Sequence, residues 1–231
     1  IRLSLVGSEM CIRDRASPNC STIPLVMVLG PLLSHAGIAR VVVSTYQAAS
    51  GAGKGGVDEL LAQTRAALDG EKGPEPKTFS RRIAFNLLPH IDRFMDRGYT
   101  REEWKLVRET RKILHRPDLA VTCTAVRVPV LNSHSESVTI DFAEPVSPAR
   151  VREILARAAG VLVMDDPQKP LYPVPEDATG RDEVLVGRIR EDISRKGSIN
   201  LWIVSDNIRK GAALNAVQIA ESICQGPPRS R

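Results

Sequence analysis

The 231-residue chain lacks the features that would place it in a membrane or on nucleic acid. Aromatic residues make up only 4% of it and do not interleave with basic ones, which argues against a nucleic-acid surface. No apolar run is long enough to span a bilayer, and the first residues lack the apolar core and cleavage site of a signal peptide. The net charge of +5 is spread along the chain, so it favours anionic small ligands at most.

Cysteine is also scarce, and its spacing fits neither a metal site nor a disulfide framework. The chain has four cysteines, Cys11, Cys20, Cys123 and Cys224. Sparse cysteines without a pairing pattern favour a reducing compartment. The sequence therefore predicts a cytoplasmic protein without a bound metal.

The two ends are expected to lie outside the folded unit. Residues 1–15 begin without Met and have no clear period, and residues 7–15 resemble translated sequencing-adapter sequence. We predict that residues 1–15 are a non-native segment and that the polar, Pro-containing residues 225–231 are a disordered tail. Residues 16–224 remain as one folded domain, which the length allows.

Strand and helix patterns alternate irregularly along this domain. Valine-rich and β-branched runs predict strands at residues 39–45, 119–131, 137–142, 161–164, 184–189 and 199–204. Helical spacing predicts helices at residues 57–68, 148–158 and 209–223, and a capping box, Thr100 to Glu103, opens another that ends before Pro117. On that helix we expect Trp104, Val107 and Leu114 to face the core. The order predicts an α+β fold with a mixed, largely antiparallel sheet and helices packed on it.

One short polar turn carries the clearest chemical signal. The segment Ser17-Pro-Asn-Cys-Ser-Thr22 places Cys20 directly before the apolar residues 23–29. At a helix start, free backbone N–H groups and the helix dipole favour a thiolate, so Cys20 is a candidate nucleophile. A small buried cysteine is the alternative, and the hexapeptide alone does not decide between them.

Eight segments, taken together and in order, resemble the aspartate-semialdehyde dehydrogenase family. They are residues 18–22, 44–53, 85–92, 109–113, 126–130, 133–136, 205–211 and 215–221. The resemblance covers nearly all of residues 16–221. The family begins with a nucleotide-binding domain whose glycine-rich turn holds the dinucleotide, and unrelated-looking residues stand before Cys20 here. The chain thus resembles the family's second half, its catalytic and dimerisation domain, with Ser17 where the family usually has Asn.

The resemblance implies a reaction and partners. The fold would be that of the glyceraldehyde-phosphate-dehydrogenase-like catalytic domain. The reaction would be NADPH-dependent reductive dephosphorylation of L-aspartyl 4-phosphate to aspartate 4-semialdehyde, a step toward lysine (through diaminopimelate), threonine, methionine and isoleucine. A cysteine suits this reaction, because a thiolate attacks an acyl phosphate to form a thioester and later departs as the leaving group. NADP(H) carries the hydride. A homodimer is implied, with no nucleic-acid or membrane partner.

The same resemblance assigns roles by motif position. His134 is the general acid/base, and Gln47 orients the acyl intermediate. Arg127 binds the substrate carboxylate through its two-pronged guanidinium. The other implied contacts are Glu109 to the substrate ammonium, Lys112 and Asn19 to phosphate, and Ser50, Gly51 and Asn207 to the cofactor. Without the family, Glu109 and Lys112 are simply an i,i+3 surface pair.

Two other functions stay open. N-acetyl-γ-glutamyl-phosphate reductase shares the fold and the thioester chemistry, but it usually carries a Gly-Cys-Tyr motif. Asn19-Cys20-Ser21 and the block at residues 109–113 argue against it. The other alternative is a truncated, non-catalytic fragment that retains only dimerisation. Under either interpretation of the chain as a part of the family's enzyme, we expect the chain as written to be an incomplete, inactive fragment that neither binds NADPH tightly nor turns over.

Overall fold

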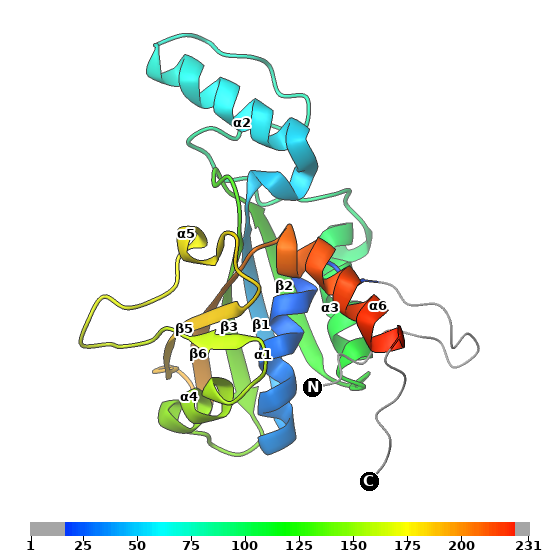
Figure 1. Cartoon of the computed structure of the whole chain (residues 1–231), viewed down its shortest axis with the longest axis vertical. Helices are drawn as coiled ribbons and strands as arrows, with labels where there is room; N and C mark the ends of the chain where they lie inside the picture. The colour runs from blue at the N-terminus through cyan, green and yellow to red at the C-terminus, as the bar shows by residue number, and fades with distance from the viewer. Residues whose placement is uncertain (1–16, 225–231) are drawn as a thin grey trace.

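A six-stranded sheet lies at the centre of the computed structural model, which describes residues 17–224 (Figure 1). The strand order is β2-β1-β3-β6-β5-β4. The central pairs are antiparallel, whereas β2 pairs parallel to β1 at one edge and β4 parallel to β5 at the other. The bounds are β1 Ile38–Gln47, β2 Ala120–Arg127, β3 His134–Phe142, β4 Val161–Val163, β5 Val184–Glu191 and β6 Ser198–Ser205. The predicted mixed, largely antiparallel sheet is confirmed.

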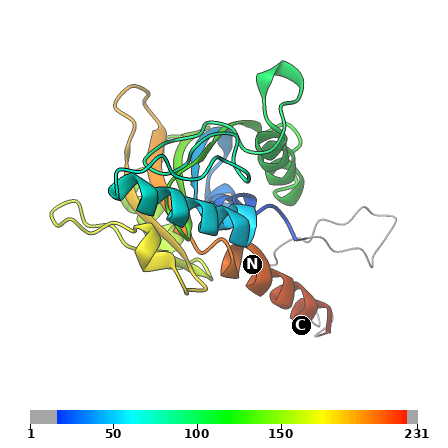
Figure 2. The same cartoon turned by 90° about the horizontal axis from the view of Figure 1, so that it is seen from above.

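Helices cover one face of this sheet and one of its ends. The helices are α1 Thr22–His35, α2 Gly53–Leu68, α3 Arg101–Ile113, α4 Pro148–Ala156, α5 Pro175–Ala178 and α6 Leu214–Cys224. Short 3-10 turns span Ala49–Ala52 and Asp96–Gly98, and a π-helical turn, Arg209–Ala213, precedes α6. Figure 1 shows α1 in front of the strands and α3 beside β2. Figure 2, seen from above, shows α2 across the near end of the sheet.

The main core lies between the sheet and α1, α3 and α4. Helix α1 is apolar around most of its circumference, so it buries side chains such as Ile23, Leu25 and Leu29 completely. They pack in one cluster with Leu106 of α3 and Val43 of β1. Each fully buried side chain of this size stabilises the fold by about 1.5–3 kcal/mol. This packing fixes the start of α1, and with it Cys20, against the sheet.

The middle of the other sheet face has no helix on it among the described residues. Alternate side chains of β1, β3 and β6, such as Tyr46, Ser137 and Trp202, are half-buried there. Only the β5–β6 end is covered, where Ala178 of α5 packs with Leu185 and Val204. We call the half-buried side chains of residues 42, 44, 46, 137, 139, 200 and 202 the open face.

The predicted capping box at Thr100 and the predicted helix start at residue 148 are confirmed. Thr100 Oγ1 accepts a hydrogen bond from the Glu103 N–H at 3.3 Å, and the Thr100 N–H donates to Glu103 Oε2 at 2.7 Å. Ser147 Oγ accepts from the Arg150 N–H at 3.2 Å. These side chains satisfy N–H groups that a helix start leaves without partners.

Several predicted boundaries were wrong. Helix α2 begins at Gly53 rather than at residue 57, because the glycine-rich segment joins the helix. Strand β3 begins at residue 134 rather than 137, and β2 ends at residue 127 rather than 131. The final helix begins as a π-helical turn.

The predicted inward stripe of α3 was also partly wrong. Leu106, Val107 and Ile113 are buried, but Trp104 is only half-buried. The Trp104 ring lies 5.6 Å from the Tyr99 ring and carries the Arg108 guanidinium on its face at 4.8 Å. It therefore packs at the edge of the core, and shorter side chains fill the centre.

The predictions for residues 1–15, Cys11 and the tail at residues 225–231 lie outside the described residues. Within residues 17–224, no helix is both long and apolar enough to cross a membrane. The same residues hold no group of three or more His, Cys, Asp or Glu side chains arranged for a metal ion.

Candidate active site

The ends of four strands meet at one end of the sheet, and Gln47, Arg127 and His134 of the predicted site lie there. Strands β1 and β2 are parallel, and Gln47 pairs with Arg127 at their ends. Strand β3 runs the opposite way and begins at this end with His134, which pairs with Ser205 at the end of β6. Residues far apart in sequence therefore converge because of the sheet topology.

Cys20 precedes α1 in a turn that Asn19 organises. The Asn19 carbonyl accepts hydrogen bonds from the Thr22 and Ile23 N–H groups at 2.9 and 3.1 Å. Its side-chain Oδ1 accepts from the Ser21 N–H at 2.9 Å. The first N–H groups of the helix are thus already satisfied by Asn19 rather than directed at the Cys20 thiol.

The expectation that the helix start favours the Cys20 thiolate was wrong for the structure as it stands. Burial, reinforced by the negative charge of Glu102, raises the pKa of Cys20 to about 12, and Arg127 offsets only part of this rise. Desolvation of the charged form outweighs the dipole here. Cys20 is therefore a thiol at neutral pH in this state, and any activation must come from what binds beside it.

Glu102 of α3 connects the cysteine turn to Gln47. Its Oε1 accepts from Asn19 Nδ2 at 2.7 Å and from Gln47 Nε2 at 3.3 Å. Gln47 Nε2 also donates to Thr45 Oγ1 at 3.3 Å. Glu102 is 7% exposed, and the sequence analysis missed it. Its spacing of seven residues from Glu109, which places both on one helix face, was the available signal.

Glu109 lies along the same face of α3. It accepts a hydrogen bond from the Asn19 backbone N–H at 2.8 Å through Oε2. Lys105 lies between the two acids and brings its Nζ to 3.4 Å from Glu102 Oε2 and 3.6 Å from Asp92 Oδ2. Two carboxylates and one ammonium therefore line the side of the site that α3 forms.

Lys112 lies further along α3 and away from this group. It is exposed and lines an open hollow with Arg108, Arg111, His115 and Pro117. At 1.5 Å of rise per residue, seven residues separate it from Lys105 by about 10 Å along the helix axis. Its phosphate role stays a prediction.

His134 is fully enclosed and neutral. Its Nδ1 accepts a hydrogen bond from the Ala48 N–H at 3.1 Å, so the ring proton belongs on Nε2. Nε2 is buried and has no hydrogen-bond partner among the described residues. Burial and the nearby Arg127 lower the pKa of His134 to about 3. At neutral pH it therefore presents an N–H donor to whatever occupies the site.

Arg127 is held beside this imidazole. Its Nη1 donates to the Ala48 carbonyl at 2.8 Å, and its backbone N–H and carbonyl both pair with Leu88 at 2.8 and 3.0 Å. The Phe79 ring lies 5.9 Å from the guanidinium carbon. Burial lowers the pKa of Arg127, but its ordinary value is so high that the side chain stays cationic.

Gly51 passes so close to both groups that no side chain fits. A Cβ atom there would lie 2.5 Å from Arg127 Nη1 and 3.0–3.1 Å from the His134 ring. The segment from Gly51 to Gly56 also reads Gly-x-Gly-x-x-Gly between a strand and a helix, a pattern typical of phosphate-binding turns.

The residues predicted to contact a cofactor are joined directly. The Ser50 hydroxyl and the Asn207 amide lie 3.0–3.2 Å apart, and Asn207 Oδ1 accepts from the Ser133 N–H at 2.9 Å. Ser50 and Asn207 are separated by 157 positions in sequence. Their pairing ties the turn after β1 to the segment after β6 beside His134.

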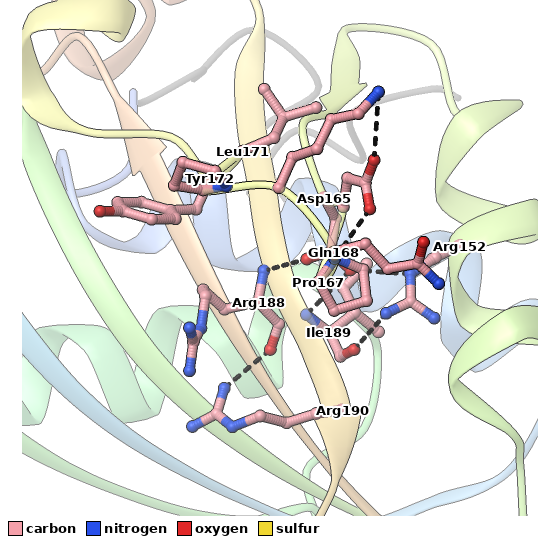
Figure 3. Close-up of a pocket in the computed structure, with 12 residues that line it drawn as sticks. Arg152, Asp165, Pro167, Gln168, Leu171, Tyr172, Arg188, Ile189 and Arg190 are labelled. Atoms are coloured by element: carbon pink, nitrogen blue, oxygen red, sulfur yellow. Dashed lines mark hydrogen bonds and ion pairs between the residues drawn. The ribbon is translucent and has the colours of Figure 1, made fainter.

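A second hollow, of about 420 Å³, lies at the other edge of the sheet, near β5 (Figure 3). Asp165 accepts from Arg152 Nε at 2.7 Å and from the backbone N–H groups of Arg188 and Ile189 at 2.7 and 3.2 Å. The hollow contains none of the predicted site residues. The Asp165 contacts tie α4 to the bulged strand β5.

Comparison with known proteins places the chain in a family. Residues 29–210 match the family model described as semialdehyde dehydrogenase, dimerisation domain. The chain is 53% identical over 206 residues to the aspartate-semialdehyde dehydrogenase of Aquifex aeolicus (strain VF5), covering 89% of this chain and 61% of that relative. It is 49% identical over 216 residues to that of Bacillus subtilis (strain 168), covering 90% and 62%.

Solved structures agree in fold. The crystal structure of aspartate semialdehyde dehydrogenase II from Vibrio cholerae complexed with ASA gives a TM-score of 0.87 at 48% identity, covering 90% of this chain and 61% of that one. The Candida albicans enzyme with NADP gives 0.65 at 27% identity, covering 88% and 55%. The chain spans about three fifths of the length of the curated relatives it matches.

Proposed function

The chain belongs to the semialdehyde dehydrogenase family, and we propose that it is the thiol-bearing part of an NADPH-dependent aspartate-semialdehyde dehydrogenase. The observation that carries the proposal is the convergence of four residues at one end of the sheet: Cys20, Gln47, Arg127 and His134. The substrate is L-aspartyl 4-phosphate, and the product is L-aspartate 4-semialdehyde, which feeds the synthesis of lysine, threonine, methionine and isoleucine.

The substrate charges fit the charges of the site. The guanidinium of Arg127 is the cation for the α-carboxylate. Of the two α3 acids, Glu102 reaches Gln47, whereas Glu109 contacts the Asn19 backbone. We therefore assign the substrate ammonium to Glu102, with Glu109 behind it. Asn19 and a lysine of α3 contact the phosphate. Lys105 is the better placed of the two candidate lysines, because it lies closer to Glu102 than Lys112 does.

Substrate binding would also activate the nucleophile. Glu102 is the largest charged contribution that raises the pKa of Cys20. An ammonium bound at Glu102 would cancel that charge and lower the thiol pKa. Cys20 Sγ then attacks the acyl carbon, the carbon–oxygen bond to phosphate breaks, and a thioester forms. The thiol is thus reactive when substrate is present and inert when it is not.

His134 and Gln47 act on the oxygen of the acyl group. Gln47 Nε2 already donates to Glu102, so its amide is oriented before substrate arrives. The Nε2–H of His134 is shared with the alkoxide oxygen that reduction of the thioester produces. When that adduct collapses to the aldehyde, Nε2 keeps this proton and Cys20 leaves as a thiolate.

The groups around Ser50 fit NADP(H). When bound, the nicotinamide supplies the hydride that reduces the thioester. Ser50 and Asn207 form a linked surface next to His134, and the absence of a side chain at Gly51 lets Arg127 and His134 approach this turn closely. Helix α2 begins directly after this turn, which favours an anion.

The protein pairs through the open face, in our proposal. The matched family model describes a dimerisation domain. The open face carries two aromatic side chains, Tyr46 and Trp202, whose ring centroids are 5.4 Å apart, and uncharged Ser137 lies on the strand between theirs. A homodimer would bury these side chains around a two-fold axis. A cytoplasmic location fits the free thiols Cys20, Cys123 and Cys224.

A substrate comparison tests the proposal. The chain is completed with the part of the Aquifex aeolicus relative that the match does not cover, and the chimera is assayed with L-aspartyl 4-phosphate and with N-acetyl-γ-glutamyl phosphate. We expect NADPH oxidation with the first and none above background with the second. Preference for the second would identify the reductase of the other acyl phosphate. If a folded chimera binds NADPH but turns over neither substrate, the remaining interpretation is a non-catalytic chain that serves only dimerisation.

The second part of the experiment uses the 231-residue chain by itself. We expect calorimetry to give weaker NADPH binding for the 231 residues than for the chimera, because the family resemblance places the turn and helix N-terminus that hold the dinucleotide pyrophosphate in the added part. Equal affinity, with turnover by the chain alone, would contradict this expectation.

A further inference from the structure

Glu136 of β3 is a buried acid that the proposed chemistry does not use. It is 0% exposed, and neither carboxyl oxygen has a hydrogen-bond partner among the described residues. It lies two residues after His134, so both side chains point to the same sheet face. In the register it stands directly opposite Thr45 of β1 and Ile203 of β6.

The groups around Glu136 belong to the nucleophile's surroundings. A charge at Glu136 acts on Cys20 and on Cys123 of β2. The other charged or titratable groups on this side are Glu102 and Glu103 of α3, Arg127 of β2 and His134 of β3. Glu103 is occupied by the Thr100 and Ala125 N–H groups. Arg127 donates to the Ala48 carbonyl, and no contact joins it to Glu136.

An ionised carboxylate in this position would be very unfavourable. It would be a buried charge without a hydrogen bond or an ion pair, and such groups take up a proton instead. Burial accordingly raises the pKa of Glu136 well above its ordinary range. Glu144, two residues after the end of β3, is exposed and escapes this constraint.

We propose that Glu136 is a positioning residue that stays a neutral carboxylic acid in the buried surroundings of Cys20 and shares a single ionisation with the thiol. While both groups are protonated, Glu136 adds no charge to these surroundings, and Glu102 and Arg127 are the charged side chains that act on Cys20. Once one of the two groups loses its proton to solvent, the negative charge opposes loss of the second. At high pH, ionised Glu136 thus limits formation of the Cys20 thiolate.

The test compares Glu136→Gln with the unchanged chain. The amide has the shape and charge of the neutral acid but cannot ionise. The rate of Cys20 alkylation by iodoacetamide is followed from neutral to alkaline pH by mass spectrometry of the peptide that carries it, because the thiolate is the reactive form. Glu144→Gln is the matched control and should follow the unchanged chain at every pH.

We expect the two rates to agree within about twofold at neutral pH and to diverge in alkali. There Glu136→Gln should react faster by about tenfold, because coupling of one pK unit corresponds to that factor. A faster rate for the variant by the same factor at neutral pH would mean that Glu136 is ionised at rest and would overturn the proposal. Equal rates at every pH would overturn the shared ionisation.

A measurement on the unchanged chain covers the case in which the variant does not fold. Infrared spectroscopy at neutral pH should detect the carbonyl stretch of a protonated carboxylic acid, which ionised carboxylates lack. Absence of this band would refute the neutral acid. The proposal takes Cys20 as the nucleophile of the proposed function, but neither experiment uses substrate or cofactor, so each fails independently of that function.

Discussion

The two faces of the sheet use alternate residues of the same strands in opposite ways. On the face covered by α1 and α3, Gln47, Arg127 and His134 are almost fully enclosed and held by specific hydrogen bonds. On the open face, Tyr46 and Ser137 are half-buried, and no helix within residues 17–224 covers them. Since side chains of a strand alternate in direction, a single-residue step along β1 separates the proposed chemistry from the proposed pairing surface.

The largest effect should come from Cys20 on the covered face. In the chimera, Cys20→Ala should lower turnover by on the order of 10⁴-fold or more, because no other group supplies a covalent intermediate. Cys123→Ala is the control, since Cys123 is buried on β2 and its pKa is raised by burial. It should change stability but keep turnover. Turnover of Cys20→Ala at the unchanged rate would remove Cys20 from the mechanism.

Substitutions of the neighbouring residues Arg127 and His134 should change different kinetic constants. Arg127→Lys keeps the charge but loses the planar fork, so it should mainly raise KM. His134→Ala removes the proton donor and should lower kcat by about 10²–10⁴-fold. Steady-state kinetics of both variants decide the matter. A KM effect for His134 together with a kcat effect for Arg127 would exchange their assigned roles.

Gly51→Ala tests how tightly the covered face is packed around these two side chains. The added methyl group would meet Arg127 Nη1 at 2.5 Å, so either the loop or the guanidinium must move. A shift of about 1 Å in such a group lowers activity by about 10²-fold. Gly30→Ala in α1 is the matched control, because its Cβ would meet only Leu114 at an ordinary 3.9 Å. Equal activity of the two variants would show that the loop adapts freely.

The sequence predicted the parts of this site that local patterns encode. The order of strand and helix patterns indicated the mixed sheet, and the capping box indicated the start of α3. The motifs indicated Cys20 and His134 as site residues. It did not predict the state of Cys20, because burial and Glu102 outweigh the local helix start. Glu102 was missed for the same reason: its contact with Asn19 spans 83 positions and follows from the packing of α3. The catalytic and binding roles themselves stay predictions.

The substitution with the smallest expected effect on the chemistry gives the sharpest test of whether the two faces have separate functions. Ser137 follows Glu136 directly and points to the open face, where it stands opposite Ser44 and Trp202. Ser137→Lys should weaken self-association by at least about tenfold, because a two-fold interface brings both copies of the new charge together. Sedimentation equilibrium measures this association, and Ala156→Lys, at an exposed position of α4, is the control for added charge.

The same variant should leave the Cys20 alkylation rate unchanged, whereas Glu136→Gln should alter that rate in alkali and leave association unchanged. This reciprocal pattern requires that neighbouring residues on one strand serve separate functions. If Ser137→Lys associates like the control, the open face is not where the protein pairs. If it slows or speeds Cys20 alkylation, the two faces are coupled through the sheet, and pairing itself becomes a determinant of thiol reactivity.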